Sequence, residues 1–150
     1  MKNIEEKLIG FLSQGYCTPQ IAALAKKTGE PATTLHYNIK RMEKEGKVAS
    51  YKAAFDYSKL GKGFCTYVLL NLSPDEYADP ERIAKDLSKF QEIESVDIVT
   101  GDWELIVKIR TRDVEEYYAF LRAVLSRKGI TKMKSLNSLK QVKSEFVVLD

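Results

Sequence analysis

The sequence predicts an α+β protein of two domains, a helical module followed by a ferredoxin-like domain of β-α-β-β-α-β order. Apolar residues recur at helical spacing through residues 1–46, and the first long run of strand-forming residues begins only at Phe64. Beyond that point strand-like and helical segments alternate. A chain of 150 residues can bury two small cores, and we place the domain boundaries at 1–50, 51–62 and 63–150.

Two short helices are expected in the first 28 residues. The first carries Ile4 and Leu8 on one stripe and ends near Gly15, because glycine suits a helix C-terminal cap. The second is expected to begin with Thr18 as an N-cap hydroxyl and Pro19 in its first turn, where the missing N–H costs nothing.

A third helix and an extended segment complete the predicted module. The helix follows the turn at Thr28–Pro31, places Leu35 and Ile39 on its inner side and stops at Gly46. Residues 47–56 are rich in strand formers and predict a ribbon packed on the helices. Three helices and a ribbon within about 55 residues predict a winged helix-turn-helix.

The second half predicts the ferredoxin-like domain. In order, we expect a buried strand at Phe64–Leu72, a turn at Ser73–Asp75, a helix over 79–90, strands at Ile93–Thr100 and Trp103–Thr111, a helix over 113–127, a strand at Lys132–Leu139 and an appended strand at Phe146–Leu149. Glycine at 101 favours a two-residue type II′ turn between the middle strands. In the second helix, Asp113 should be the N-cap, and Val114, Tyr118, Leu121 and Leu125 should face inward.

Charge is unevenly divided along the chain. Residues 1–62 carry eleven lysines and arginines against six acidic residues, a net charge of +5, whereas the remainder carries −2. Clustered cations are what neutralisation of DNA phosphates requires, so the division indicates a nucleic-acid-facing first half.

The outer face of the third helix is suited to the DNA major groove. Side chains near its start would reach base edges, and later cations would reach phosphates. The candidates for base contact are Thr33, Thr34, His36 and Tyr37; those for backbone contact are Lys40, Arg41 and Lys44 on the helix and Lys47 and Lys52 on the wing. The competing interpretation is a solvated amphipathic helix whose lysines pair with Glu43 and Glu45.

Composition argues against several other classes of protein. Cys17 and Cys65 are the only cysteines and His36 is the only histidine, so neither a disulfide framework nor a metal or cofactor site is expected. The first ten residues include two glutamates, and no run is long and apolar enough for a membrane helix, so we expect no membrane association and a cytoplasmic location.

Two stretches carry a family resemblance that covers nearly the whole chain. They are IAALAKKTGEPATTLHYNIKRMEKEGKVASYKAAFDYSKLG and VDIVTGDWELIVKIRTRD. In this order they resemble the Lrp/AsnC family of bacterial and archaeal transcription regulators. The resemblance implies a sequence-specific DNA-binding regulator that forms a homodimer and assembles further, to a tetramer or octamer. Its C-terminal domain, often called RAM, would build subunit contacts and bind an amino-acid effector.

The resemblance also implies an effector site at the middle hairpin. By position, Gly101, Asp102, Trp103 and Glu104 would form it, with the carboxylate holding an α-ammonium group and turn N–H groups holding a carboxylate. The family usually has aspartate where this chain has Glu104. The alternative is a plain hairpin in which Trp103 is a core or interface aromatic. A second departure lies before the third helix, where Glu30-Pro31 replaces an apolar residue and a serine cap.

Three further interpretations concern assembly and activity. A sheet covered by helices on one face should pair its free face with a second copy, and the apolar residues assigned to that face are Phe64, Tyr67, Leu69, Trp103 and Ile109. A small-molecule sensor without DNA binding is one alternative function. An enzyme similar to the sirohaem decarboxylases, on the same scaffold and with Tyr117, Tyr118 and Arg122 as candidates, is the other.

Overall fold

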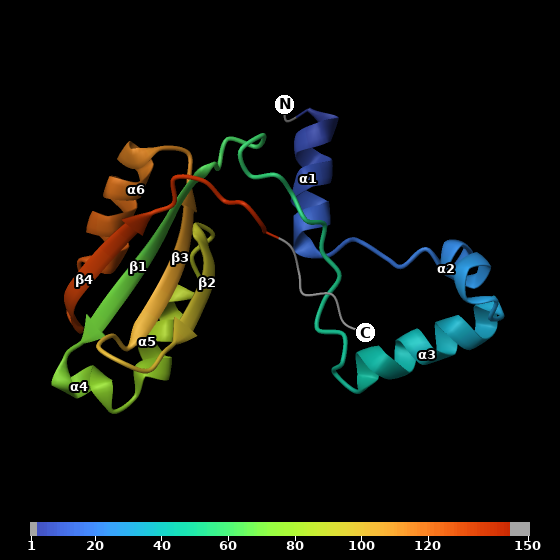
Figure 1. Ribbon diagram of the computed structural model, residues 1–150, viewed down its shortest axis with the longest axis horizontal. Coiled ribbons are helices and arrows are strands. Elements are labelled where there is room, and N and C mark those ends of the chain that lie inside the picture. The colour runs from blue at the N-terminus through green and yellow to red at the C-terminus, as the bar shows by residue number, and fades with distance from the viewer. Residues whose placement is uncertain (1–2, 145–150) are drawn as a thin grey trace. The chain divides into compact units, whose positions relative to one another are not determined.

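The computed structural model describes residues 3–144, and the chain forms two compact units, Met1–Phe55 and Asp56–Asp150 (Figure 1). The division falls inside the segment 51–62 that the sequence suggested as a hinge. Each unit is described by itself below.

The first unit contains α1 (Ile4–Gln14), α2 (Ile21–Thr28) and α3 (Ala32–Lys44). The N-cap Asn3 accepts a hydrogen bond from the Glu6 N–H at 2.9 Å, and Gly15 ends α1 in the left-handed conformation at φ 107°. The expected start of α2 was two residues too early. Thr18 and Pro19 remain outside the helix, and Gln20 is the N-cap without a side-chain capping bond.

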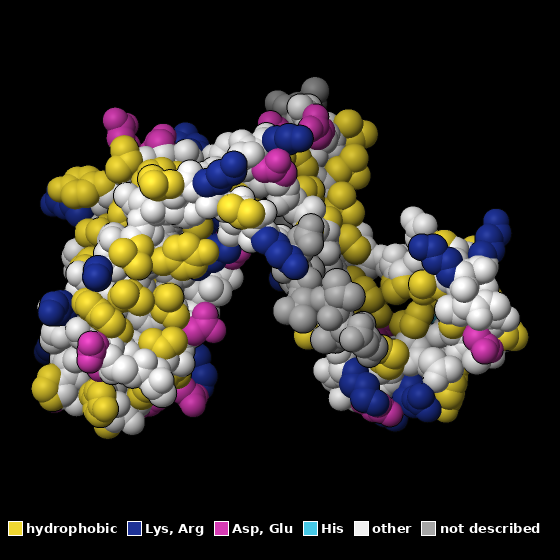
Figure 2. Space-filling model, viewed as in Figure 1, with side chains coloured by type: hydrophobic (Ala, Val, Ile, Leu, Met, Phe, Trp, Pro, Cys, Tyr) yellow, Lys and Arg dark blue, Asp and Glu magenta, His cyan; other side chains and the backbone are white. Residues whose placement is uncertain are grey.

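The helical unit has almost no core of its own. None of residues 3–55 is buried, and the apolar stripe of α1 is largely exposed, with 78% of Ile4, 54% of Leu8 and 53% of Phe11 accessible. Figure 2 shows hydrophobic side chains along one side of α1. The ring of Phe11 meets only the edge of Tyr16, with centroids 5.1 Å apart. The apolar stripe of α1 therefore lies largely in solvent in the single chain.

The ribbon expected over residues 47–56 is not formed. These residues contain no strand, because within the unit no second strand lies beside them to complete a ladder. Instead the segment is a connector held at two points. The Ala53 N–H donates to the Leu12 carbonyl at the end of α1 (3.2 Å), and the Tyr51 hydroxyl donates to Glu43 on α3 (3.1 Å).

The second unit is a four-stranded antiparallel sheet with helices. Its strands are β1 (Phe64–Leu72), β2 (Ile93–Ile98), β3 (Leu105–Thr111) and β4 (Ile130–Asn137), in the spatial order β2-β3-β1-β4. The helices are α4 (Pro74–Tyr77), α5 (Pro80–Leu87) and α6 (Val114–Phe120), the last continuing as the π-helical turn η1 (Leu121–Leu125). The predicted ferredoxin-like order is confirmed, and the turn expected at residues 73–75 is the start of α4.

One face of the sheet packs on α5, α6 and η1. Val68, Leu70 and Val107 are completely buried there against Leu87 and Leu125. Tyr117, Phe120 and Val124 supply the inner stripe of the last helical segment, whereas Val114 and Tyr118 are 58% and 59% exposed. The stripe predicted from Val114 and Tyr118 was therefore wrong by one position at the start of the helix, although Leu125 is buried as expected.

Other expectations for this unit differ in detail. Residues 99–104 join β2 to β3, and the Val99 N–H donates to the Glu104 carbonyl (2.9 Å), so the loop is longer than the predicted two-residue turn. The last strand ends at Asn137, where Ser138 bonds to Cys65. The appended strand expected at Phe146–Leu149 lies outside the described residues.

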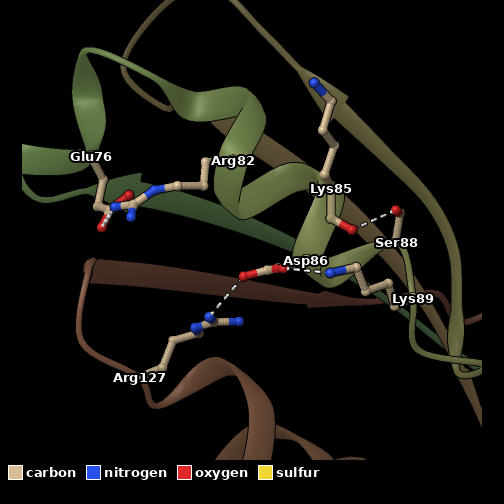
Figure 3. A network of polar contacts seen from close by, with 7 residues as sticks. All are labelled: Glu76, Arg82, Lys85, Asp86, Ser88, Lys89 and Arg127. Carbon is tan, nitrogen blue, oxygen red and sulfur yellow. Dashed lines mark hydrogen bonds and ion pairs between the residues drawn. The ribbon is translucent and has the colours of Figure 1, made fainter.

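Ion pairs connect the helical layer to neighbouring loops (Figure 3). The Asp86 carboxylate on α5 forms ion pairs with the Lys89 ammonium at 2.8 Å and with the guanidinium of Arg127, which follows η1, at 3.4 Å. Glu76 on α4 pairs with Arg82 on α5. The Asp86 pKa lies below its ordinary value because Lys89 donates a hydrogen bond to it, with Arg127 adding to the effect.

Candidate nucleic-acid interface and effector loop

Four of the residues predicted to contact bases or phosphates lie on one side of helix α3. One hollow is lined by these four, Thr33, His36, Tyr37 and Lys40, together with Ala32 and with Ile21 at the start of α2. Tyr37 is 67% exposed, and Thr33 and His36 are exposed too. The opposite side of the helix carries Leu35 and Ile39, which are half-buried, as the helical spacing predicted.

Helix α3 begins after a proline and has no capping hydroxyl. Pro31 is the N-cap and makes no side-chain hydrogen bond, while its carbonyl accepts the Leu35 N–H at 3.1 Å. In the preceding turn the Thr28 hydroxyl donates to Leu24 (2.9 Å) and accepts the Glu30 N–H (3.3 Å). This turn orients α3 relative to α2 with no help from a serine cap.

Three of the predicted phosphate contacts already have acidic partners. Lys40 pairs with Glu43 at 2.8 Å, Lys47 pairs with Glu45 at 2.6 Å, and Arg41 lies 3.8 Å from Glu45. The pairs of the competing solvated-helix interpretation are thus present. The basic side chains and Glu45 are exposed and Glu43 is half-buried, and such surface pairs contribute little free energy.

Glu43 is the centre of this arrangement, and sequence reasoning assigned it no functional role. One carboxylate oxygen accepts from Lys40 and the other from the Tyr51 hydroxyl. The hydrogen bond from Lys40 lowers the Glu43 pKa and raises that of Lys40. Partial burial, with the bond to Glu43, raises the pKa of Tyr51. The spacing of Lys40 and Glu43 along a helix was a signal for the pair, whereas the contact with Tyr51 was not readable.

The remaining candidates on the first unit stand in solvent. Thr34, Lys44 and Lys52 are exposed, and Thr34 contributes its carbonyl to the Asn38 side chain at 2.9 Å. Asn38 in turn accepts from Arg41 at 2.9 Å, which directs that guanidinium along the helix.

The effector candidates form the loop between β2 and β3. Gly101 has φ 109°, a conformation that favours glycine, and Asp102 is exposed. The Glu104 carboxylate accepts from the Leu72 N–H (2.8 Å) and from the Asn71 side-chain amide (3.1 Å). The same amide donates to the Asp102 carbonyl at 2.7 Å.

The acidic group of the candidate effector site therefore ties the loop to β1. Asn71, which sequence reasoning missed, holds both Glu104 and Asp102; 33 residues separate it from Glu104, so no local pattern could reveal the contact. Trp103 is half-buried, with the Lys132 ammonium 5.6 Å from its ring centroid. A hollow of about 580 Å³ lies away from this loop, between α5 and the edge strand β2.

The free face of the sheet differs from the expected set. Ile109 is completely buried on the helix side, and Phe64 packs there against Tyr117, with ring centroids 6.0 Å apart. Alternation along β1 places them opposite Tyr67 and Leu69, which remain half-buried on the other face.

A charged cluster completes this face. Glu94 on β2 accepts from Lys108 (2.7 Å) and Arg110 (2.6 Å) on β3, and the Arg110 guanidinium stacks on Tyr57 at 4.5 Å. Burial raises the Glu94 pKa, but the two donated hydrogen bonds outweigh it, so the net pKa is lowered. Burial also raises the pKa of the neighbouring Cys65 thiol.

The described residues contain neither a cluster of metal ligands nor a membrane-spanning helix. Within residues 3–144, no three histidine, cysteine or acidic side chains converge as a metal site. In that same range no helix has the length and apolar character needed to span a membrane.

Comparisons with known proteins agree with the fold. The chain resembles the crystal structure of an AsnC family transcriptional regulator from Agrobacterium tumefaciens, with a TM-score of 0.78 and 22% identity over 99% of this chain and 97% of that one. The structure of Escherichia coli AsnC gives a TM-score of 0.74 at 17% identity, covering 98% of both chains.

Sequence comparison shows the family directly. An uncharacterized HTH-type transcriptional regulator of Pyrococcus furiosus is 33% identical over 127 residues, covering 84% of this chain and 85% of its own length. Residues 65–148 match the model of the Lrp/AsnC ligand binding domain. A family model that matches more than half of the chain and a relative at this identity show the family, and the chain accordingly belongs to the Lrp/AsnC family of transcriptional regulators.

Proposed function

We propose that the protein regulates transcription by docking α3 in the major groove of duplex DNA. The observation that carries the proposal is the single exposed side of α3 on which Thr33, His36, Tyr37 and Lys40 lie together. An α-helix fits this groove with its first residues at the base edges, and Lys40 and Lys44 follow toward the phosphates. Thr34, Arg41, Lys47 and Lys52 complete the proposed contact set.

The two kinds of contact predict two kinds of mutant. Lys44→Ala removes a proposed phosphate contact, so binding should weaken about equally for all sequences and the salt dependence should flatten. Tyr37→Ala should instead relax sequence preference. The absence of any such difference between the two variants would contradict the assignment of roles.

The primary test is selection of bound fragments from random duplex DNA at two salt concentrations. Recovery of a short inverted repeat, with affinity that falls steeply as salt rises, would support a dimeric sequence-specific regulator. Failure to enrich any sequence at either salt, with the protein folded, would overturn the proposal in favour of a sensor without DNA binding.

We further propose that the protein acts as a homodimer, through the free face of the sheet. Tyr67 and Leu69 lie there with Ile106 and Leu136, and a symmetric pair would also present two copies of α3 to an inverted repeat. Sedimentation of a monomer at micromolar concentration would contradict this arrangement. Tetramers or octamers would then be assemblies of such dimers.

An amino acid is the effector class that we propose for the loop at Gly101–Glu104. A feast or famine regulatory protein of Mycobacterium tuberculosis, similar in fold with a TM-score of 0.73 and 19% identity over 84% of each chain, was solved in complex with L-methionine. In this chain one oxygen of Glu104 is occupied by Leu72 and Asn71, which leaves the other to receive an α-ammonium group.

Calorimetry with each of the twenty amino acids tests this effector assignment. Heat from one or a few of them, lost in Glu104→Gln, would support it, because the amide keeps the acceptor for Leu72 but lacks the charge. No heat with any amino acid would leave Glu104 with only its contacts to β1.

A further inference from the structure

The hollow beside α3 is apolar although it lies on the proposed reading side of the helix. It has a volume of about 560 Å³ and lies between the start of α2 and the first half of α3. Its wall is almost entirely carbon, and the residues that form it are Ile21, Ala32, Thr33, His36, Tyr37 and Lys40.

The position of this wall limits what it can recognise. Ala32 and Thr33 open α3, the end of a recognition helix that reaches base edges, and each presents a methyl group. Ile21 adds an aliphatic side chain from α2, and Tyr37, 67% exposed, adds a ring. Because little of the exposed wall is polar, the partner that this hollow fits best at a base edge is an apolar group.

The major groove presents one apolar group at base edges, the 5-methyl of thymine. We propose that this hollow recognises thymine through its methyl group, so that part of the sequence preference is apolar readout by Ala32, Thr33 and Ile21. The inference rests on the proposed docking of α3 and names the chemistry that this surface reads. Lys40 also lines the hollow and would supply the cation for the flanking phosphate.

The expected loss of DNA affinity follows from the burial of one methyl group. Removing a buried methyl costs roughly 0.8 kcal/mol, which corresponds to about a fourfold loss of affinity. Uracil differs from thymine only by that methyl and keeps the same pairing edge. Replacement of thymine by uracil therefore isolates the proposed contact.

The experiment begins with the sequence selected from random DNA and replaces its thymines by uracil one at a time. We expect one or two positions in each half-site at which uracil lowers the affinity about fourfold, while the other positions leave it unchanged. Equal affinity for all uracil-substituted duplexes would overturn the inference and leave the proposed DNA binding intact. If no duplex binds at all, the proposed function itself fails, and the inference with it.

A pair of conservative variants locates the contact on the protein. Thr33→Ser removes the methyl of a side chain that lines the hollow and keeps its hydroxyl, so it should bring the thymine-to-uracil affinity ratio toward one. Thr34→Ser is the matched control, because Thr34 is exposed but does not line the hollow, and its ratio should stay at the wild-type value. Equal ratios in wild type and Thr33→Ser would overturn the assignment of Thr33.

Discussion

Under the proposed function, Glu43 would compete with DNA phosphates for Lys40, and a substitution of this one residue tests that competition. In Glu43→Gln the side chain can still accept from Tyr51, but the charge that holds Lys40 is gone. We expect tighter DNA binding and a salt dependence steeper by up to about 0.9 in the logarithmic slope, because Lys40 then releases a counterion of DNA in place of an internal partner. Titration at several salt concentrations measures both.

The control for this variant must change the net charge equally. Glu5→Gln does so on α1, and within residues 3–144 no basic side chain forms an ion pair with Glu5. A similar gain in both variants would mean that net charge alone is responsible. No gain in Glu43→Gln would show that the Lys40 ammonium does not approach a phosphate.

Glu94 makes the stability of the sheet depend on pH. Its pKa in the folded protein is lowered from the ordinary 4.5, because the hydrogen bonds from Lys108 and Arg110 outweigh the opposing effect of burial. A lowered folded pKa contributes stability above the unfolded pKa, and this contribution is lost as the pH falls through the folded value.

We therefore expect the midpoint of urea unfolding for the wild type to fall as the pH drops below about 4.5. In Glu94→Gln the midpoint should be lower at pH 7 and should decline less over the acid range. Parallel curves for the two proteins would show that this carboxylate does not contribute to the acid sensitivity.

At the scale of elements, the N-caps of α5 and α6 differ, so replacing them by alanine should lower the free energy of unfolding by unequal amounts. Asp113 begins α6 and accepts from the Glu116 N–H at 2.8 Å, whereas Asp79 precedes α5 without a capping bond. Asp113→Ala should lower the free energy of unfolding by about 1 kcal/mol, and Asp79→Ala should lower it much less. Chemical denaturation measures both, and equal losses would contradict the assignment of the cap.

The elements also show what a sequence can predict. The continuous apolar run gave β1 its correct bounds at Phe64–Leu72, because a strand buried on one face and half-covered on the other needs little else. The segment 47–56 carries Val48, Tyr51 and Phe55 as strand formers but has no strand beside it, and it forms a connector. The inner stripe of α6 depends on its contact with the sheet, which fixes Tyr117 inward in place of Tyr118.

The sequence predicted the local geometry of the candidate sites but not their long-range contacts. Helical periodicity placed Thr33, His36 and Tyr37 on one side of α3, because that geometry is local. The bond between Asn71 and Glu104 arises from strand β1 and the loop before β3, which become neighbours only in the folded sheet. The apolar character of the hollow likewise depends on α2 lying beside α3.

For the whole molecule, the proposed dimer predicts that one charged substitution separates the subunits. Leu69 lies half-buried on the free face of the sheet, so Leu69→Asp would place a charge in the proposed interface and should shift the protein to monomers. Val114→Asp is the control, because Val114 is 58% exposed beside the helices. Sedimentation velocity distinguishes the two, and a stable Leu69→Asp dimer would place the interface elsewhere.

The helical unit has a thermodynamic consequence of its own. Residues 3–55 contain no buried side chain, whereas the sheet unit has Leu70, Leu105 and several others fully enclosed. A module with so little enclosed surface has a small unfolding free energy, so whatever binds its folded form raises its thermal stability in proportion to the logarithm of ligand concentration. Under the proposed function, DNA that binds α3 would therefore also stabilise the folded state of the helical unit.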